Sequence, residues 1–337
     1  MTGFTRRGAL GMMGGAATLP LLGAPALANT KLTVGALRFT SHAASFVAYE
    51  RGYFTDEGLD VEFRFFEAAQ PMAVAIASGD ADYAVTAITG GLISLAEKGA
   101  AKVIGGALSE EKGIDGQMIL ASNAAYEAGL TSPAQLDGKT FAVTQPGSSF
   151  HYMGSKIAEA EGVSVSFKPL QKVGAIIGAM KSGQVDAWSI VPHIGKALAG
   201  GGAVQPIGQV ADYIPDYQVT TVFTSAENAA NERAKTEAFL RAFSRGAADF
   251  NAALVDKTAG DAAADEMVQL IHKYVYTDRP LEKAAPSIRN GAMRINEGAA
   301  LNMSSVEDQV GWFKSEGLIK EGITTETLVD TSYVETM

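Results

Sequence analysis

Residues 31–66 have the sequence KLTVGALRFTSHAASFVAYERGYFTDEGLDVEFRFF, and this stretch decides the fold class. Alternating and β-branched residues predict one strand over residues 31–36 and a second over residues 59–66. Between them, residues 43–52 have the composition of a helix that ends at Gly52, a residue type common at helix C-termini. The order strand, helix, strand predicts a βαβ unit in a mostly parallel sheet.

The same alternation continues along the chain. Helices are expected over residues 71–78 and 90–97, and strands over residues 83–87 and 102–107. A second unit begins with a strand at residues 140–144 and runs through further helices and strands to the glycines at residues 200–202. From residue 228 the chain turns mostly helical, and the helical spacing of Phe239, Phe243, Ala247, Phe250 and Leu254 predicts core positions.

Two strand-like segments, residues 117–122 and 218–224, frame the second unit. We therefore expect two lobes, each a mostly parallel sheet flanked by helices. Lobe 1 would comprise residues 29–118 plus 225–337, and lobe 2 residues 119–222. A chain that leaves a lobe and returns to it gives two hinge strands, which is a geometry suited to closure around a ligand.

The first 28 residues predict a removable signal peptide. Arg6 and Arg7 precede a weakly apolar stretch that ends in Ala26-Leu27-Ala28, a cleavage-site pattern. The adjacent arginines favour the twin-arginine (Tat) route, and periplasmic localisation is expected. The alternative is a membrane anchor, which four glycines and two prolines between residues 11 and 25 disfavour.

Composition narrows the function classes. Residues 29–337 carry 25 basic and 37 acidic residues, a balance that argues against nucleic acid and anionic membrane surfaces as partners. The chain has no cysteine, so stability must come from cores rather than disulfides, and thiol nucleophiles and cysteine metal sites are excluded.

Several motifs in the first two thirds of the chain carry a family resemblance. They are, in order, VG at residues 34–35, AASFVAYERGYF at 43–54, EGLDV at 57–61, IASGDADY at 76–83, LDGK at 136–139, GSS at 147–149 and KSGQVDA at 181–187. This pattern resembles the sulfonate, nitrate, taurine and thiamine-pyrimidine group of ABC-importer binding proteins. The resemblance implies a two-lobed periplasmic binding protein fold (type II-like), a solute held between the lobes, a permease partner in the inner membrane and a monomer.

The predicted ligand site lies at four corners where a strand leads into a helix. Ligands of open α/β sheets bind beyond the carboxyl ends of the strands, and helix N-termini there favour anions. The corners contribute Thr40, Ser41 and His42; Thr86 and Thr89; Gly147, Ser148, Ser149 and His151; and Trp188 and His193. The alternative for each serine and threonine is a helix N-cap alone.

Arg38 and Trp188 have two interpretations each. Arg38, at the end of the first strand, pairs either with an anionic solute or with an acidic residue of its own lobe. Trp188 either contacts the solute or completes the core of lobe 2. His151, like His42, is expected to hydrogen-bond the solute. No metal is expected, because the histidines do not form a ligand-spacing motif such as HExxH.

Two classes of function remain. In one, the protein is a receptor that closes around a small, anionic organic solute, a sulfonate or carboxylate, with a neutral heterocycle as the alternative. In the other, the same fold carries catalysis, as in cysteine-dependent relatives. The missing cysteine favours the receptor, so no catalytic residue and no cofactor are expected. The sequence alone does not name the solute.

Overall fold

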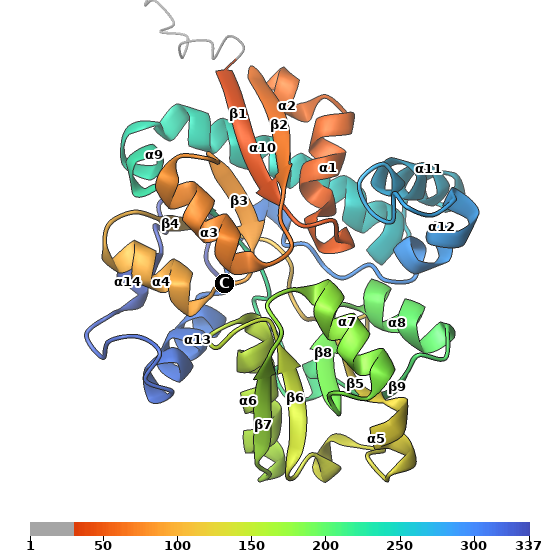
Figure 1. Ribbon diagram of the computed structural model, residues 1–337. Coiled ribbons are helices and arrows are strands. Elements are labelled where there is room, and N and C mark those ends of the chain that lie inside the picture. The colour runs from red at the N-terminus through yellow and green to blue at the C-terminus, as the bar shows by residue number, and fades with distance from the viewer. Residues whose placement is uncertain (1–29) are drawn as a thin grey trace, which may run out of the picture.

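The computed structural model describes residues 30–337; the predicted signal peptide lies outside the described residues. Two five-stranded sheets lie one above the other (Figure 1). The first has the order β2 (Leu59–Phe65), β1 (Thr30–Ala36), β3 (Tyr83–Thr86), β10 (Thr221–Thr224) and β4 (Lys102–Gly106). The second has the order β7 (Val165–Pro169), β6 (Lys139–Val143), β8 (Ala187–Ile190), β5 (Met118–Ser122) and β9 (Val204–Gln209).

Both sheets are mixed rather than wholly parallel. In the first sheet β1 runs parallel to β2 and β3, whereas β10 runs antiparallel to β3 and β4. In the second, β6 runs parallel to β7 and β8, whereas β5 runs antiparallel to β8 and β9. The reversed strands, β5 and β10, are the first strands after each crossing between the sheets. The chain crosses near the carboxyl ends of the other strands, so it enters each new sheet from that edge and runs the opposite way.

Helices flank both sheets and account for most of the last hundred residues. Around the first sheet lie α1 (Ala43–Glu50), α2 (Tyr53–Asp56), α3 (Ala69–Ser78) and α4 (Gly90–Glu97). Around the second lie α5 (Asn123–Glu127), α6 (Ser149–Glu161), α7 (Val173–Ser182) and α8 (Pro192–Gly200). The C-terminal part contains α9 (Ala226–Asn231), α10 (Arg233–Phe250), α11 (Asp261–His272), α12 (Leu281–Arg289), α13 (Met303–Ser315) and α14 (Thr325–Leu328). Short turns of other helix types occur at Thr40–His42, Pro133–Gln135, Val210–Asp212, Asn251–Val255 and Glu297–Ala299.

The two halves repeat one local device at matching places. In the first sheet the Asp82 carboxylate accepts the Thr33 backbone N–H at 2.8 Å, and the Asp82 N–H donates to the Thr33 carbonyl at 2.8 Å. In the second, the Asp186 carboxylate accepts the Thr140 N–H at 2.7 Å, and the Asp186 N–H donates to the Thr140 carbonyl at 3.2 Å. These bonds tie the start of one strand to the next, which gives a structural role to the aspartates Asp82 and Asp186 in the motifs IASGDADY and KSGQVDA.

The crossings between the sheets lie side by side. After β4 the chain crosses to β5, and after β9 it returns to β10. The segments pair as antiparallel neighbours at Ser109 and Gln218, and the Val219 N–H donates to the Leu108 carbonyl at 2.9 Å. The segments predicted as hinge strands therefore contain β5 and β10 themselves, each paired inside one sheet, with the crossings just before them. The exact lobe boundaries stay a prediction.

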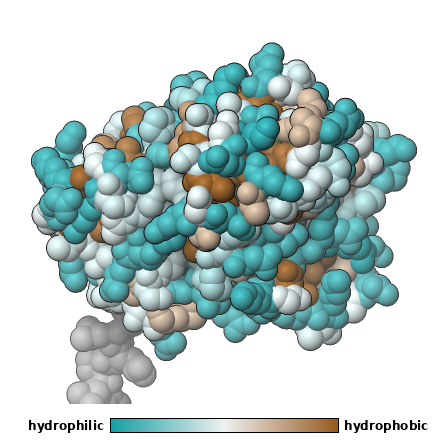
Figure 2. All heavy atoms as spheres, turned by 90° about the horizontal axis from the view of Figure 1, so that it is seen from below, coloured by the Kyte–Doolittle hydropathy of each residue, from teal (hydrophilic) through white to brown (hydrophobic). Residues whose placement is uncertain are grey.

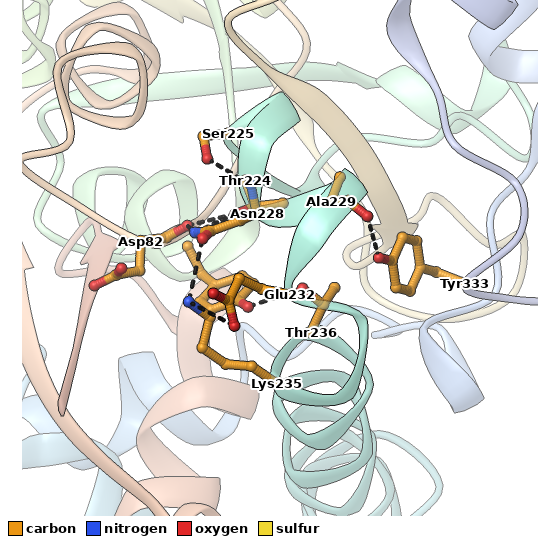
Figure 3. Close-up of polar contacts among 10 residues, drawn as sticks. Asp82, Thr224, Ser225, Asn228, Ala229, Glu232, Lys235, Thr236 and Tyr333 are labelled. Carbon is orange, nitrogen blue, oxygen red and sulfur yellow. Dashed lines mark hydrogen bonds and ion pairs between the residues drawn. The ribbon is translucent and has the colours of Figure 1, made fainter. Parts of the chain in front are cut away.

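A polar network fastens the returning chain to the first sheet (Figure 3). The Thr224 hydroxyl at the end of β10 donates to the Asp82 carbonyl at 2.6 Å, and the Asn228 amide of α9 donates to the Thr224 hydroxyl at 3.2 Å. Near the C-terminus the Tyr333 hydroxyl donates to the Ala229 carbonyl at 2.5 Å. The helical C-terminal part is thus anchored to the sheet that the N-terminal half builds.

The long helix α10 packs its apolar stripe against the first sheet. Phe239 stacks on Tyr83 of β3 with ring centroids 4.2 Å apart, and Phe243 and Phe250 are fully enclosed. The predicted core stripe along residues 239–254 is confirmed. Helix α13 reaches the second sheet instead, where Trp312 packs edge-on to Tyr152 of α6 at 5.3 Å.

The surface seen from below is mostly hydrophilic, with hydrophobic residues in small separate groups (Figure 2). Among the large hydrophobic side chains in the described part of the chain, those left exposed include Tyr49, Val74 and Tyr126. Across residues 30–337, no helix has both the length and the apolar character needed to cross a bilayer.

Candidate functional site

A cavity opens between the two sheets where the carboxyl ends of their strands face each other. It encloses about 560 Å³ of space free of protein atoms, including its mouth. The residues that line this central cavity are Leu37, Phe39, Ser41, His42, Ala68, Ala69, Thr86, Ala87, Leu108, Gln117, Thr144, Ser148, Ser149, Phe150, Val173, Ile190, Val191, Val219 and Thr220.

All four strand-to-helix corners contribute to this lining, together with both crossing segments. Aliphatic and aromatic side chains cover much of the wall, and the polar groups are hydroxyls, one amide and one imidazole. Among the described lining residues none is Asp, Glu, Lys or Arg. The chemistry of the wall is therefore that of an apolar chamber with a few neutral donors and acceptors.

The first corner places Ser41 and His42 in the cavity wall. His42 is 1% exposed, and its Nδ1 accepts the Leu37 backbone N–H at 3.4 Å. Burial lowers the pKa of His42 to about 3, so the ring is neutral at physiological pH and carries its proton on Nε2. Thr40 points elsewhere, since its hydroxyl donates to the Gly291 carbonyl at 3.3 Å.

At the second corner Thr86 lines the cavity, whereas Thr89 acts as a helix cap. The Thr89 hydroxyl accepts the Leu92 backbone N–H at 3.1 Å and donates to the Gln70 side chain at 3.1 Å. Thr89 therefore has the N-cap role that the sequence left open as an alternative to solute contact, and it lies outside the central cavity.

At the third corner Ser148 and Ser149 line the cavity at the start of α6. Gly147 adopts a left-handed conformation (φ 72°), and its carbonyl accepts the Gly90 N–H of the other lobe at 3.0 Å. His151 turns back into the corner, where its Nδ1 accepts the Gly147 N–H at 3.1 Å. Its ring packs against Trp312 at 5.1 Å rather than lining the cavity, and burial lowers its pKa.

At the fourth corner Ile190 and Val191 line the cavity, and the two residues singled out in the sequence lie behind them. Trp188 is fully buried in β8 and packs edge-on to Phe150 at 5.6 Å. His193 is 1% exposed, and its Nδ1 lies 2.9 Å from the Tyr276 hydroxyl. Burial lowers the pKa of His193 to about 3, with a smaller contribution from His42.

Arg38 lies outside the central cavity. Its guanidinium stacks over the Phe65 ring at 3.8 Å and donates to the Tyr274 carbonyl at 3.1 Å. It lines a neighbouring surface hollow together with Lys172, which forms an ion pair with Glu67 at 3.0 Å. Within the described chain Arg38 forms no ion pair with a carboxylate, so the interpretation that it pairs with an acidic residue of its own lobe is wrong; contact with the solute stays a prediction.

Several lining residues were not singled out from the sequence. Phe39 lies just before the first corner, and Thr144 lies just before the third. Gln117, Val219 and Thr220 come from the crossing segments, and no local pattern indicated that they meet the strand ends. Their place in the wall follows from the way the two crossings pass between the sheets.

Contacts between the lobes surround the cavity. Besides the Gly90–Gly147 bond, the Gln145 amide donates to the Gln70 side chain at 3.2 Å, and Lys172 pairs with Glu67 at 3.0 Å. The lobes are thus in direct contact, and these three links hold the rim of the cavity. Across residues 30–337, no group of three or more His, Asp or Glu side chains is arranged to hold a metal ion.

The sequence comparison decides the family. A family model described as NMT1/THI5 like matches residues 39–253, which is more than half of the chain. The chain belongs to the NMT1/THI5-like family. No curated protein sequence matches it significantly.

Solved structures show that this NMT1/THI5-like protein shares the fold of ABC-importer binding proteins. The alkanesulfonate-binding protein SsuA of Xanthomonas axonopodis pv. citri, bound to MOPS, has a TM-score of 0.71 at 15% identity, over 90% of this chain and 99% of that one. The nitrate-binding protein NrtA of Synechocystis PCC 6803 has a TM-score of 0.68 at 15% identity, over 88% and 84%. The ligand-binding component of an ABC-type import system of Staphylococcus aureus, with zinc bound, has a TM-score of 0.69 at 14% identity, over 90% and 98%. The predicted two-lobed α/β fold and the family are confirmed.

Proposed function

We propose that this protein is the periplasmic solute-binding component of an ABC importer and captures a small organic acid in the central cavity. The observation that carries the proposal is the cavity itself, built from the strand ends of both lobes and both crossings. Solved proteins with this fold are named as binding alkanesulfonates and nitrate, which supports an anionic solute. The partner would be the permease of the importer.

The acid group would be bound by neutral donors. Helix α6 starts at Ser149, and the first N–H groups of a helix have no partner within it. In the described chain the Ser149 and Phe150 N–H groups donate to no protein acceptor, and both residues line the cavity. The positive end of the helix dipole and these amides favour a carboxylate or sulfonate. The aliphatic wall would accommodate the body of the solute.

A second candidate is an uncharged solute such as a neutral heterocycle. The observation that favours it is the absence of Lys and Arg among the described lining residues, which leaves an anion without a counter-charge. Anions bind to preorganised neutral donors in a dry cavity, so the lack of a cation does not by itself decide against an acid.

Binding without turnover is part of the proposal. The serine and histidine of the third corner are joined only through the backbone N–H of His151, which donates to the Ser148 hydroxyl at 3.4 Å. The imidazole Nδ1 of His151 is engaged by the Gly147 N–H instead. This arrangement lacks the contact between a nucleophile and a base that covalent catalysis needs.

A thermal-shift and calorimetry screen tests the solute class. Benzenesulfonate, benzoate and butanesulfonate should raise the melting temperature by preferential binding to the folded state, and benzyl alcohol should do so less. A panel in which only uncharged heterocycles bind would replace the acid with the second candidate. Unchanged small-angle scattering at saturating solute would contradict closure of the lobes at the two crossings.

Export is tested separately. We propose that residues 1–28 are a twin-arginine signal, removed after Ala28. The protein recovered from the periplasm should begin near residue 29, and replacing Arg6 and Arg7 with lysine should retain the precursor in the cytoplasm. Periplasmic recovery of that variant at wild-type levels would argue for a different route.

A further inference from the structure

Gln117 is a buried amide that the fold leaves without a partner. It lies just before β5, where the chain enters the second lobe, and it lines the central cavity although it is 2% exposed. Across residues 30–337 its Nε2 has no hydrogen-bond partner. An amide donor removed from water without a partner is unfavourable, so a group in the cavity that accepts from it would relieve that cost.

The backbone of Gln117 is held by a buried carboxyl. Both oxygens of Glu110 approach the Gln117 N–H, at 3.0 and 3.4 Å, and Glu110 is 2% exposed. The Glu110 N–H donates to the Tyr217 carbonyl at 2.9 Å, which ties it to the returning crossing. Gly116 leaves space for the carboxyl, because a Cβ there would lie 2.4 Å from Glu110 Oε2. Glu110 thus fixes the backbone of Gln117 and, with it, the place from which the Gln117 side chain extends.

The surroundings of Glu110 leave the Gln117 amide available. Burial raises the pKa of Glu110 to about 7, and the Gln117 backbone N–H, together with the nearby Gln117 side-chain amide, opposes that rise. A primary amide has two N–H groups, so proximity to the carboxyl leaves one for the cavity. Glu110 also lines a second hollow together with Arg294, whose guanidinium pairs with Glu111 and Asp256 at 2.7 Å each. Besides Glu110, the acidic side chains that line this hollow are Glu111, Asp216 and Glu297, and the Tyr217 hydroxyl lies buried nearby.

We propose that Gln117 is a specificity-determining residue of the solute site, donating a hydrogen bond from its side-chain amide to an acceptor oxygen of the solute, and that Glu110 positions it. The inference rests on the proposed function, since it assumes a solute in the central cavity. It assigns selectivity to the crossing segment, in addition to the strand-end corners. Solutes with a carboxylate, sulfonate or carbonyl oxygen at the crossing fit this donor.

The test for Gln117 uses two probes and two variants. Benzenesulfonate and benzoate are titrated by calorimetry into wild type, Gln117→Met and the control Gln205→Met, whose amide bonds Asn123 at 3.0 Å outside the cavity. Methionine keeps the unbranched shape and removes the donor. We expect Gln117→Met to bind about tenfold or more weakly, as for a lost hydrogen bond to a charged group. Gln205→Met should bind like wild type.

Two results would overturn this role. One is equal affinity of Gln117→Met and wild type for a probe that binds. The other is a clear fall in the melting temperature of ligand-free Gln117→Met, because the amide would then be a structural partner of Glu110. If neither probe binds wild type, the acidic solute of the proposed function fails instead. In that case, a melting temperature of ligand-free Gln117→Met equal to that of wild type still supports the Gln117 amide as a donor to a solute of different chemistry.

The positioning role of Glu110 is tested by rescue. Glu110→Gln keeps an oxygen that accepts the Gln117 N–H, whereas Glu110→Ala removes it. We expect probe affinity within about threefold of wild type in the first and about tenfold weaker in the second, the size of one hydrogen bond. In the ligand-free protein, the ¹H NMR shift of the Gln117 backbone amide should stay in place in Glu110→Gln and move upfield in Glu110→Ala. Equal effects of both substitutions on that shift would overturn the positioning role.

Discussion

Replacing Glu110 with glutamine should make the stability of the protein less dependent on pH. Glu110 is 2% exposed, and the groups that stabilise its charge are the backbone N–H and the nearby side chain of Gln117. Burial raises the pKa of Glu110 from its ordinary value of 4.5 to about 7. A group whose pKa is raised on folding binds more protons in the folded state, so its contribution to stability falls as pH rises.

The size of the effect follows from the difference between the two pKa values. Each pKa unit corresponds to about 1.4 kcal/mol, so the contribution of Glu110 should decrease by about 3 kcal/mol between pH 4.5 and pH 8. It is fully present below pH 4.5 and is lost as pH rises through 7. Glutamine has no charge to bury. Relative to wild type, Glu110→Gln should therefore gain stability at pH 8 and change little near pH 5.

Urea unfolding of both proteins at pH 5 and pH 8 measures this difference. His42 and His193 have lowered pKa values and destabilise the fold as pH falls below 6.5, in the opposite direction. Their contribution is the same in both proteins and cancels in the comparison. Glu307→Gln, at an exposed position of α13, serves as the control for the same carboxyl-to-amide change on the surface. An equal effect of Glu110→Gln at the two pH values would refute the reasoning, because the carboxyl would then titrate normally in the fold.

Three other substitutions separate structural from binding roles. Asp186→Asn should lower the free energy of unfolding by about 1–3 kcal/mol, since it weakens the charge-assisted bonds to the Thr140 N–H and hydroxyl, both at 2.7 Å. Thermal or urea unfolding should show this loss of stability, and calorimetry should show unchanged affinity for the solute. Trp188→Phe should lower stability by about 1–3 kcal/mol by opening space in the lobe 2 core; a large loss of affinity at unchanged stability would place Trp188 in the site instead. Ser148→Ala should lower stability by about 1 kcal/mol through the lost cap on the His151 N–H, and it should also weaken solute binding because Ser148 lines the cavity; wild-type calorimetry would contradict the second effect.

The order of elements could be predicted from sequence because it depends on local patterns. Periodicity placed β1, β3 and β6 close to their observed bounds, since alternating or continuous apolar residues are sufficient to mark a strand. The direction of β5 and β10 could not be predicted in this way. Each strand is reversed because the crossing brings the chain into the next sheet at the carboxyl ends of its other strands. The residues within β5 and β10 do not indicate at which end of the sheet the chain enters.

The candidate site could likewise be predicted from the sequence only in part. That the corners meet at a shared cleft was predictable from strand direction, and Ser41, His42, Thr86, Ser148 and Ser149 do line the cavity. Which side chains turn inward was not predictable. Thr89 and His193 bond to residues that are far away in sequence, and His151 turns back to its own corner.

By itself, then, the sequence determined the alternation of strands and helices, the family and the four corners, all of which rest on spacing and on local hydrogen bonds. The tertiary structure alone decided the composition of the cavity wall and the place of Gln117 in it. The physical reason is that burial and hydrogen-bond satisfaction depend on what the second lobe brings to each residue. Gln117 is enclosed by segments from both lobes, and only that enclosure leaves its amide buried and without a protein partner among residues 30–337.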